Sequence, residues 1–254
     1  MQKYNMDGID PKILNRLVDI ISNAVSHEYS ETMDILSLRT KNCKHFLLWD
    51  IIHKALLNSF HKDQILSTQR KRGPWEFVLL YDPTSNTIFS FIKQKRFKEL
   101  QKAKAGRKVP HYLDALVTLN NSLQAQMKQG TIFEVEGTNS ELKEKAAELL
   151  DYLCADFASA DRKIVANHVL ICFSNNSGML TSINACVLDN DFDVVEEKDL
   201  SKAISFDIGA VESQLDKQRT LSPKLKLSEK ALARASKSAK VGLKTNIEDE
   251  SKNA

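Results

Sequence analysis

Long apolar runs are missing from this sequence. The longest ones, at residues 77–81 and 169–173, fall far short of the roughly 20 residues that a membrane-spanning helix needs. The first ten residues also lack the basic region, apolar stretch and cleavage site of an export signal. We therefore expect a cytoplasmic protein that makes no contact with a membrane.

Cysteine is scarce, and its spacing excludes the common cysteine-based sites. No two cysteines form a C-x-x-C pair, and no histidine lies at ligand spacing to any of them. Phosphate-binding glycine loops, zinc-peptidase motifs and nucleophile elbows are absent too. The sequence therefore predicts no cofactor and no metal site. It predicts reduced core thiols at Cys43, Cys154, Cys172 and Cys186.

The residues that are present predict one mixed domain. A hydrophobic content of 42% and a charged content of 27% are typical of globular proteins. Helices are expected at residues 13–25, 44–60, 95–104, 111–129 and 140–157, hairpins at 75–93 and 164–188, and short strands at 132–135 and 192–195. We predict an α/β (α+β) fold with a single mixed, mainly antiparallel sheet built from the two hairpins and packed by several helices.

The ends of several segments are marked in the sequence. Asp10 and Pro11 form a cap followed by proline at the first helical position, and Thr138 opens a capping box before the last helix. The second helix has a wide apolar face that includes Phe46. Aromatic residues vanish in the last 41 residues, where basic residues dominate. Residues 1–213 are therefore predicted to form the domain, and residues 214–254 a flexible basic tail.

The first hairpin can be predicted down to its register. A loop at residues 83–86 pairs Asp82 with Thr87, and counting back along both strands places Glu76 opposite Lys93. Two carboxylates and a lysine on one sheet resemble a restriction-type nuclease centre, in which a metal held by the acids activates water. Because six residues of strand span about 20 Å, the acids are too far apart to share an ion. A structural ion pair and a turn aspartate are the favoured interpretation.

Charge is sorted into blocks along the chain. Residues 62–108 contain twelve basic and four acidic residues, although the net charge of the whole chain is only +3. The hairpin brings the ends of this block together, so its basic residues are expected to converge on one edge of the fold. Such a patch serves nucleic-acid phosphates, an acidic protein surface, or no specific partner. Its predicted binding residues are Arg70, Lys71, Arg72, Lys93, Lys95, Arg96, Lys98, Arg107 and Lys108.

Two aromatic positions lie next to this basic block. Trp75 follows Gly73 and Pro74, and it either packs in the core or stacks a base or a peptide beside Arg72. His111 follows Pro110 at the start of a helix. It is either a surface histidine near the helix cap or a general acid or base.

The segment with Arg72-Gly-Pro-Trp-Glu, Tyr81-Asp82, Lys95-Arg96-Phe97 and His111-Tyr112-Leu113 resembles a family of bacterial proteins. Genes of that family often lie beside a regulator that combines a helix-turn-helix with a metallopeptidase-like domain, and the family is proposed to supply the toxin of such RosmerTA-type pairs. The resemblance covers about residues 69–124 and implies a cognate antitoxin as partner. It assigns no catalytic residues.

Three functions therefore remain open. The leading expectation is a bacterial toxin or phage-defence protein that acts through the basic, aromatic surface around Arg72, Trp75, Lys93, Arg96 and His111. The first alternative is a protein that binds RNA or DNA, or a metal-dependent nuclease, through the same surface. The second alternative is a non-enzymatic adaptor that binds a protein through the tail.

Overall fold

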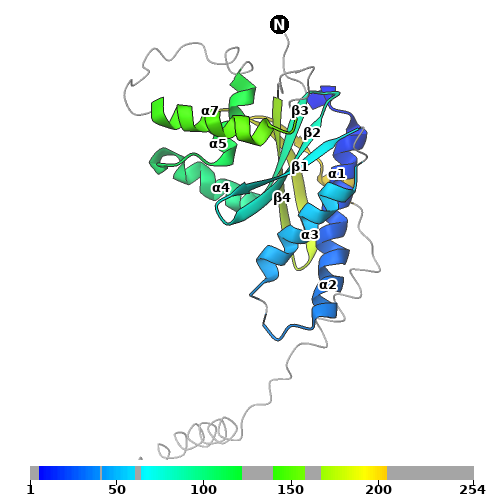
Figure 1. Ribbon diagram of the computed structural model, residues 1–254. Coiled ribbons are helices and arrows are strands. Elements are labelled where there is room, and N and C mark those ends of the chain that lie inside the picture. The colour runs from blue at the N-terminus through cyan, green and yellow to red at the C-terminus, as the bar shows by residue number, and fades with distance from the viewer. Residues whose placement is uncertain (1–5, 41, 61–63, 122–139, 158–166, 205–254) are drawn as a thin grey trace, which may run out of the picture. The chain divides into compact units, whose positions relative to one another are not determined.

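The computed structural model describes residues 6–40, 42–60, 64–121, 140–157 and 167–204 (Figure 1). These residues contain one six-stranded sheet in the order β1-β2-β3-β4-β5-β6. All neighbouring strands are antiparallel except the central pair β3 and β4. The strands are β1 Leu66–Arg72, β2 Trp75–Asp82, β3 Thr87–Lys93, β4 Asn167–Asn176, β5 Met179–Leu188 and β6 Val194–Asp199. This architecture confirms the predicted fold class.

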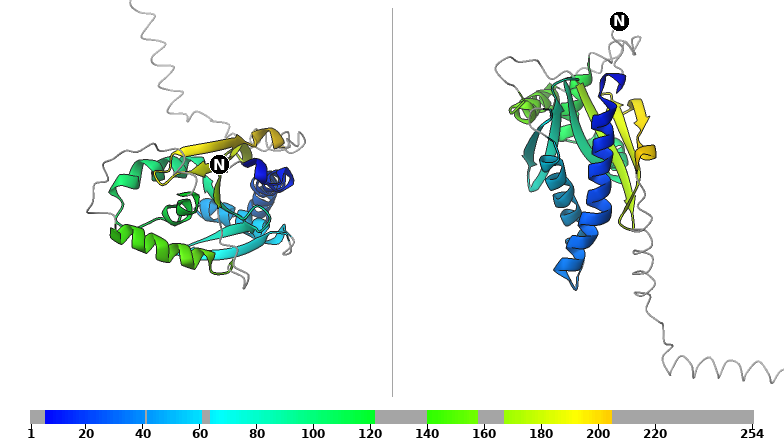
Figure 2. Two further views of the ribbon diagram at one scale, coloured as in Figure 1. Left: turned by 90° about the horizontal axis from the view of Figure 1, so that it is seen from above. Right: turned by 90° about the vertical axis from the view of Figure 1, so that its right-hand side faces the viewer.

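Helices cover both faces of the sheet, as Figure 1 shows. The helices α1 Pro11–Asn23, α2 Tyr29–Leu36 and α3 Lys44–Asn58 lie on one side. The helices α4 Gln94–Ala103, α5 Tyr112–Leu116 and α7 Ser140–Cys154 lie on the other. A π-helical turn, Ala24–Glu28, joins α1 and α2 into one long rod along the strands (Figure 2). Asp10 caps α1, because its side chain accepts a hydrogen bond from the Lys12 amide (2.8 Å).

The central strands are buried on both faces, as the sequence predicted. Val78 and Leu80 of β2 pack into a core formed with α1 and α3. The alternate residues Phe77 and Leu79 pack into a second core on the side of α5 and α7. The sheet therefore separates two apolar cores, and its strands are held rigidly in the middle layer.

The register of the first hairpin is confirmed only next to its turn. Asp82 pairs with Thr87, but the pairing of β2 with β3 ends at Leu80 and Phe89. The prediction that Glu76 lies opposite Lys93 is therefore wrong. Beyond the turn each strand follows its other neighbour: β2 pairs with β1 along its length, and β3 pairs with β4 from end to end. The two strands consequently diverge toward the start of β2 and the end of β3.

Strand β1 is the element that the sequence did not reveal. Its residues are mainly polar, because it lies at the edge of the sheet and alternate side chains face solvent. It joins β2 through a two-residue turn in which Gly73 has a φ of +58° and Pro74 follows. Glycine with positive φ at the first turn position is typical of tight hairpins.

Several other predictions can be compared with the structure. The predicted helix at residues 111–129 is described only to residue 121, as α5 and the 3₁₀ turn Val117–Asn120. The strand predicted at residues 132–135, the cap at Thr138 and the tail at residues 214–254 lie outside the described residues.

The four cysteines are free thiols, and burial raises the pKa of Cys186 to about 12. None of the described helices is both long and apolar enough to cross a membrane.

Candidate functional site

A pocket of about 750 Å³ lies where β2 and β3 diverge. The start of β2 provides Trp75 and Phe77, and the end of β3 provides the stretch from Phe91 to Lys93. The end of β1, helix α3, the first two turns of α4, the start of α5 and the end of β4 form the remaining walls. The divergence of the two strands therefore opens the sheet at a point where seven elements meet.

One wall of the pocket is aromatic. Both tryptophans of the chain, Trp49 and Trp75, line it, and their rings meet edge to face with centroids 6.2 Å apart. Phe46 and His45 continue this wall outward, with ring centroids 5.9 Å and 6.4 Å from Trp75. Phe46 is 59% exposed, so its predicted place on the buried face of its helix is wrong. It extends the aromatic wall to the surface because α3 begins just beyond the edge of the sheet's core.

Cationic side chains also line the pocket. The lining includes Arg72, Lys93, Lys95 and Arg96, and within the described residues Glu99 is its one carboxylate. Glu99 already pairs with Arg96, at 3.0 Å between Oε2 and Nη1. Burial lowers the pKa of Arg72, and the nearby Arg107 and Arg96 lower it further. The pKa of Lys93 is lowered by burial and then by Lys44. Positive charge is thus concentrated in a partly desolvated hollow, which favours an anionic ligand.

Helix α4 adds to this positive field. It begins at Gln94, directly after β3, and no side chain caps its first turn. The free amide groups of a helix start carry partial positive charge and donate hydrogen bonds to anions. Lys95 and Arg96 lie in this same turn. Backbone and side-chain charge therefore act on one part of the pocket.

His111 forms the N-cap of α5 and is 8% exposed. Its Nδ1 accepts a hydrogen bond from the Leu113 amide (3.3 Å), while its own amide donates to Asp114 (2.7 Å). Burial lowers the pKa of His111 to about 3, and the cations Arg72, Arg107 and Arg96 contribute to this shift. The ring is therefore neutral at pH 7 and carries its proton on Nε2. This residue lines the pocket with Nε2–H as an available donor, and its pKa is too low for a general base at neutral pH.

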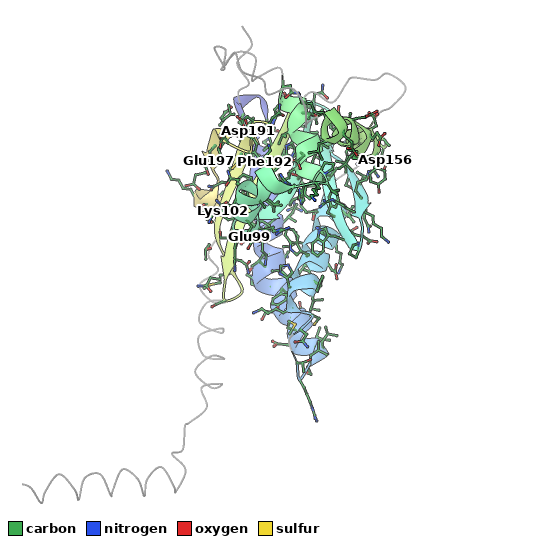
Figure 3. The ribbon with its side chains drawn as sticks, turned by 90° about the vertical axis from the view of Figure 1, so that its left-hand side faces the viewer. Glu99, Lys102, Asp156, Asp191, Phe192 and Glu197 are labelled. Carbon is green, nitrogen blue, oxygen red and sulfur yellow. The ribbon has the colours of Figure 1, made fainter. Side chains whose placement is uncertain are left out.

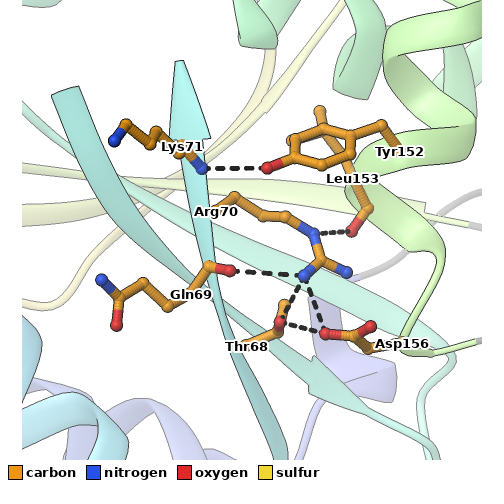
Figure 4. Close-up of polar contacts among 7 residues, drawn as sticks. All are labelled: Thr68, Gln69, Arg70, Lys71, Tyr152, Leu153 and Asp156. Carbon is orange, nitrogen blue, oxygen red and sulfur yellow. Dashed lines mark hydrogen bonds and ion pairs between the residues drawn. The ribbon is translucent and has the colours of Figure 1, made fainter. Parts of the chain in front are cut away.

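Arg70 lies outside this pocket and is buried beneath α7 (Figure 4). Its Nη1 lies 2.7 Å from Asp156 Oδ2, and its Nε donates to the Leu153 carbonyl (3.2 Å). Tyr152 lies over its guanidinium at 5.4 Å. Figure 3 shows Asp156 well separated from Glu99 on α4. The structure therefore places Arg70 in the packing between β1 and α7.

The predicted nuclease residues are also dispersed. Glu76 is exposed and contacts Lys71 of β1, with 3.9 Å between Nζ and Oε1. Asp82 lies at the far end of β2, where it accepts hydrogen bonds from the amides of Thr84 (2.9 Å) and Ser85 (3.3 Å). In the part of the chain that the structure describes, no group of three or more His, Cys, Asp or Glu residues could hold a metal. Glu76, Asp82 and Lys93 therefore do not form one centre.

The remaining predicted basic residues are not among those that line the pocket. Lys98 and Lys108 are exposed. Arg107 pairs with Asp114, at 3.1 Å between Nη2 and Oδ1. Sequence reasoning missed the wall that α3 supplies, although His45, Trp49 and His53 recur every four residues and so share one face of that helix.

We expect Arg70→Met to destabilise the domain by about 1–3 kcal/mol, because it removes charge-assisted hydrogen bonds from a buried position. Its neighbour on the strand provides the control. Lys71→Met removes an exposed cation and should change stability by less than about 0.5 kcal/mol. Urea unfolding of the two variants measures the difference. Equal midpoints for Arg70→Met and Lys71→Met would show that the contacts in Figure 4 contribute nothing.

Comparison with known proteins adds one finding. Residues 6–252 match a family described as a family of unknown function (DUF5986). No curated protein and no solved structure matches the chain.

Proposed function

The chain belongs to the DUF5986 family, whose function is unknown, and we propose from its pocket that it binds single-stranded nucleic acid. The observation that carries this proposal is the meeting of four cations and both tryptophans in one hollow. Proteins that bind single strands combine a basic surface for the phosphates with aromatic rings on which bases stack. A duplex keeps its bases stacked inside, so it cannot present them to a recessed aromatic wall.

The surface next to the pocket favours a strand over a free nucleotide. Lys95, Lys98 and Lys102 are exposed, and their spacing of three and four residues places them on one face of α4. Figure 3 looks onto the side of the molecule that carries α4 and shows Glu99 and Lys102 on that helix. Glu99 shares this face but pairs with Arg96, so the face keeps a net positive charge that begins at the pocket and matches a chain of phosphates. A free nucleotide would use the pocket alone.

Tryptophan fluorescence tests this proposal directly, since both tryptophans line the pocket. We expect short single-stranded DNA or RNA to quench this fluorescence and to bind with little dependence on base sequence. The affinity should fall steeply with salt, by roughly 0.7 log unit per log unit of salt for each phosphate contact. A duplex of the same length should bind at least about tenfold more weakly, because its bases cannot reach the aromatic wall.

Two results would count against the proposal that the pocket binds single strands. If neither single strands nor duplexes bind at low salt, the pocket serves another anion, and an acidic protein surface becomes the better hypothesis. If duplex and single strand bind equally without quenching, only the outer basic surface is used.

The toxin or phage-defence role stays a prediction, because it rests on the resemblance around Arg72, Lys95 and His111. It is compatible with the proposed binding, since a protein that captures single strands can arrest growth by occupying RNA or DNA. Expression in bacteria, with and without substitutions in the pocket, tests whether growth arrest depends on this binding.

A further inference from the structure

The charge in the pocket exceeds what one internal phosphate of a strand needs. Four cationic side chains line the pocket against Glu99, and Glu99 already pairs with Arg96. An internal phosphodiester carries one negative charge, whereas a phosphate monoester carries about 1.5 to 2 at pH 7 and offers three strong acceptor oxygens. Resting on the proposed function, we infer that the pocket seats the terminal phosphate monoester of a single strand, so that the protein recognises strand ends.

Two donors of the pocket, Arg72 and His111, are held in place before any ligand arrives. Arg72 donates from Nη2 to the Pro110 carbonyl (3.0 Å), which anchors its guanidinium at the wall. His111 is fixed by its cap contacts and directs Nε2–H as a neutral donor. Charge-assisted hydrogen bonds from anchored donors are stronger than those from mobile surface lysines. A group with several acceptor oxygens gains most from such a set.

The shape of the pocket also favours an end. The pocket lies in the angle between β2 and β3, and the pairing of Leu80 with Phe89 closes that angle on one side. Helices α3, α4 and α5 contribute further lining, and the pocket is partly open to solvent. An internal nucleotide would need room for the chain to enter and leave, whereas a terminal phosphate needs a single opening. The rest of the strand would then follow the lysines of α4.

Two of the three histidines that line the pocket have pKa values below the pH range of the test. Burial lowers the pKa of His53 to about 4 and that of His111 to about 3. The pKa of His45 is lowered by burial and then by Lys93. The second pKa of a phosphate monoester is about 6, so the dianion forms as pH rises through this value. The charged groups facing the site are Lys44, Arg72, Lys93, Lys95, Arg96, Glu99, Arg107 and Asp114.

The test compares four forms of one oligothymidylate: a free hydroxyl at both ends, a 5′-phosphate, a 3′-phosphate, and a 5′-phosphate capped as its methyl ester. At pH 7.5 we expect one phosphorylated form to bind about tenfold or more tightly than the unphosphorylated strand. The 5′ and 3′ forms show which end is read. This advantage should shrink severalfold at pH 5, where the monoester is a monoanion, and the methyl ester, which carries one negative charge, should show only the smaller advantage at both pH values.

Substitutions locate the effect. In Arg72→Gln, and independently in Arg96→Gln, the advantage of the phosphorylated strand should shrink to about twofold, whereas Lys102→Gln should weaken all four ligands to the same extent. Equal binding of all four ligands with tryptophan quenching would overturn end recognition while leaving strand binding intact. Absence of binding by every ligand would remove both proposals. An advantage that persists undiminished at pH 5 or in the methyl ester would show that the charge of the dianion is not what the pocket recognises.

Discussion

Replacing Arg72 and Arg96 together by glutamine is expected to lower the affinity for single-stranded nucleic acid by about a hundredfold or more. Hydrogen bonds to charged groups contribute about 1.5–3 kcal/mol each, and two of them together account for at least this factor. Both side chains line the pocket, and their mutual repulsion contributes to the lowered pKa of Arg72. The unliganded pocket should therefore lose little stability when the two charges are removed. Fluorescence anisotropy with a labelled oligonucleotide measures the affinity.

A matched variant separates this effect from net charge. Lys12 and Arg16 are exposed residues of α1, a helix that contributes nothing to the lining of the pocket. Lys12→Gln with Arg16→Gln removes the same two charges and should change affinity by less than about threefold at moderate salt. The slope of log affinity against log salt should fall by about 1.4 in the pocket variant alone. Equal losses in both double variants would mean that the protein binds through its overall field.

The sequence predicts the two hairpins because their signals are local. The turn at residues 83–86 and the alternation of apolar residues on both faces define β2 and β3 without reference to any other element. Strand β1 gave no such signal, since it pairs at the edge with polar residues that also suit a loop. The parallel contact of β3 with β4 joins residues about 80 positions apart, and periodicity carries no information on such pairings.

The candidate site was partly predictable, because part of it also follows from local signals in the sequence. Arg72, Trp75, Lys93, Lys95 and Arg96 flank the hairpin, so its turn predicts that they lie at the same end of the fold, where the structure places all five in the lining of the pocket. Arg70 could not be separated from Arg72 by composition. The two side chains share one face of β1, since they are two residues apart. Their different environments follow from position along the strand, because Arg70 is covered by α7, whereas Arg72 at the end of the strand donates to the Pro110 carbonyl beside α5. The wall from α3 depends on a tertiary contact between that helix and β2, which a hydrophobic stripe does not specify.

The divergence of β2 and β3 connects the fold with the proposed function. Had Glu76 paired with Lys93, the two strands would have closed the space that the pocket now occupies. Each strand is instead paired with its outer neighbour, β2 with β1 and β3 with β4. The opening therefore leaves neither strand unpaired on its outer edge. The two cores on either face keep the strands in place. A rigid gap lined by an aromatic wall and a cationic wall is suited to select a ligand that is itself part aromatic and part anionic.

Trp75→Ala is expected to weaken binding of single strands by about 1–3 kcal/mol, the usual contribution of stacking one base on an aromatic ring. Trp75 is half-buried at the pocket and touches Phe46 and Trp49, so it offers a ring face while neighbours hold it in place. Trp75→Phe keeps an aromatic face and should retain most of the affinity. Isothermal titration of both variants, with circular dichroism to verify folding, gives the comparison.

Fluorescence adds an internal check on where the ligand binds. In Trp75→Phe the remaining tryptophan is Trp49, which lies 7% exposed in the same wall and contacts Phe173 (5.5 Å between ring centroids). Its emission should still respond to a strand in the pocket, while an iodide quencher should reach it poorly in the free protein. If Trp75→Ala and Trp75→Phe lose affinity equally although both are folded, stacking is not the contribution of this residue. Its role would then be to set the position of Arg72 through the turn that links them, because Arg72 pairs directly with Trp75 across Gly73 and Pro74.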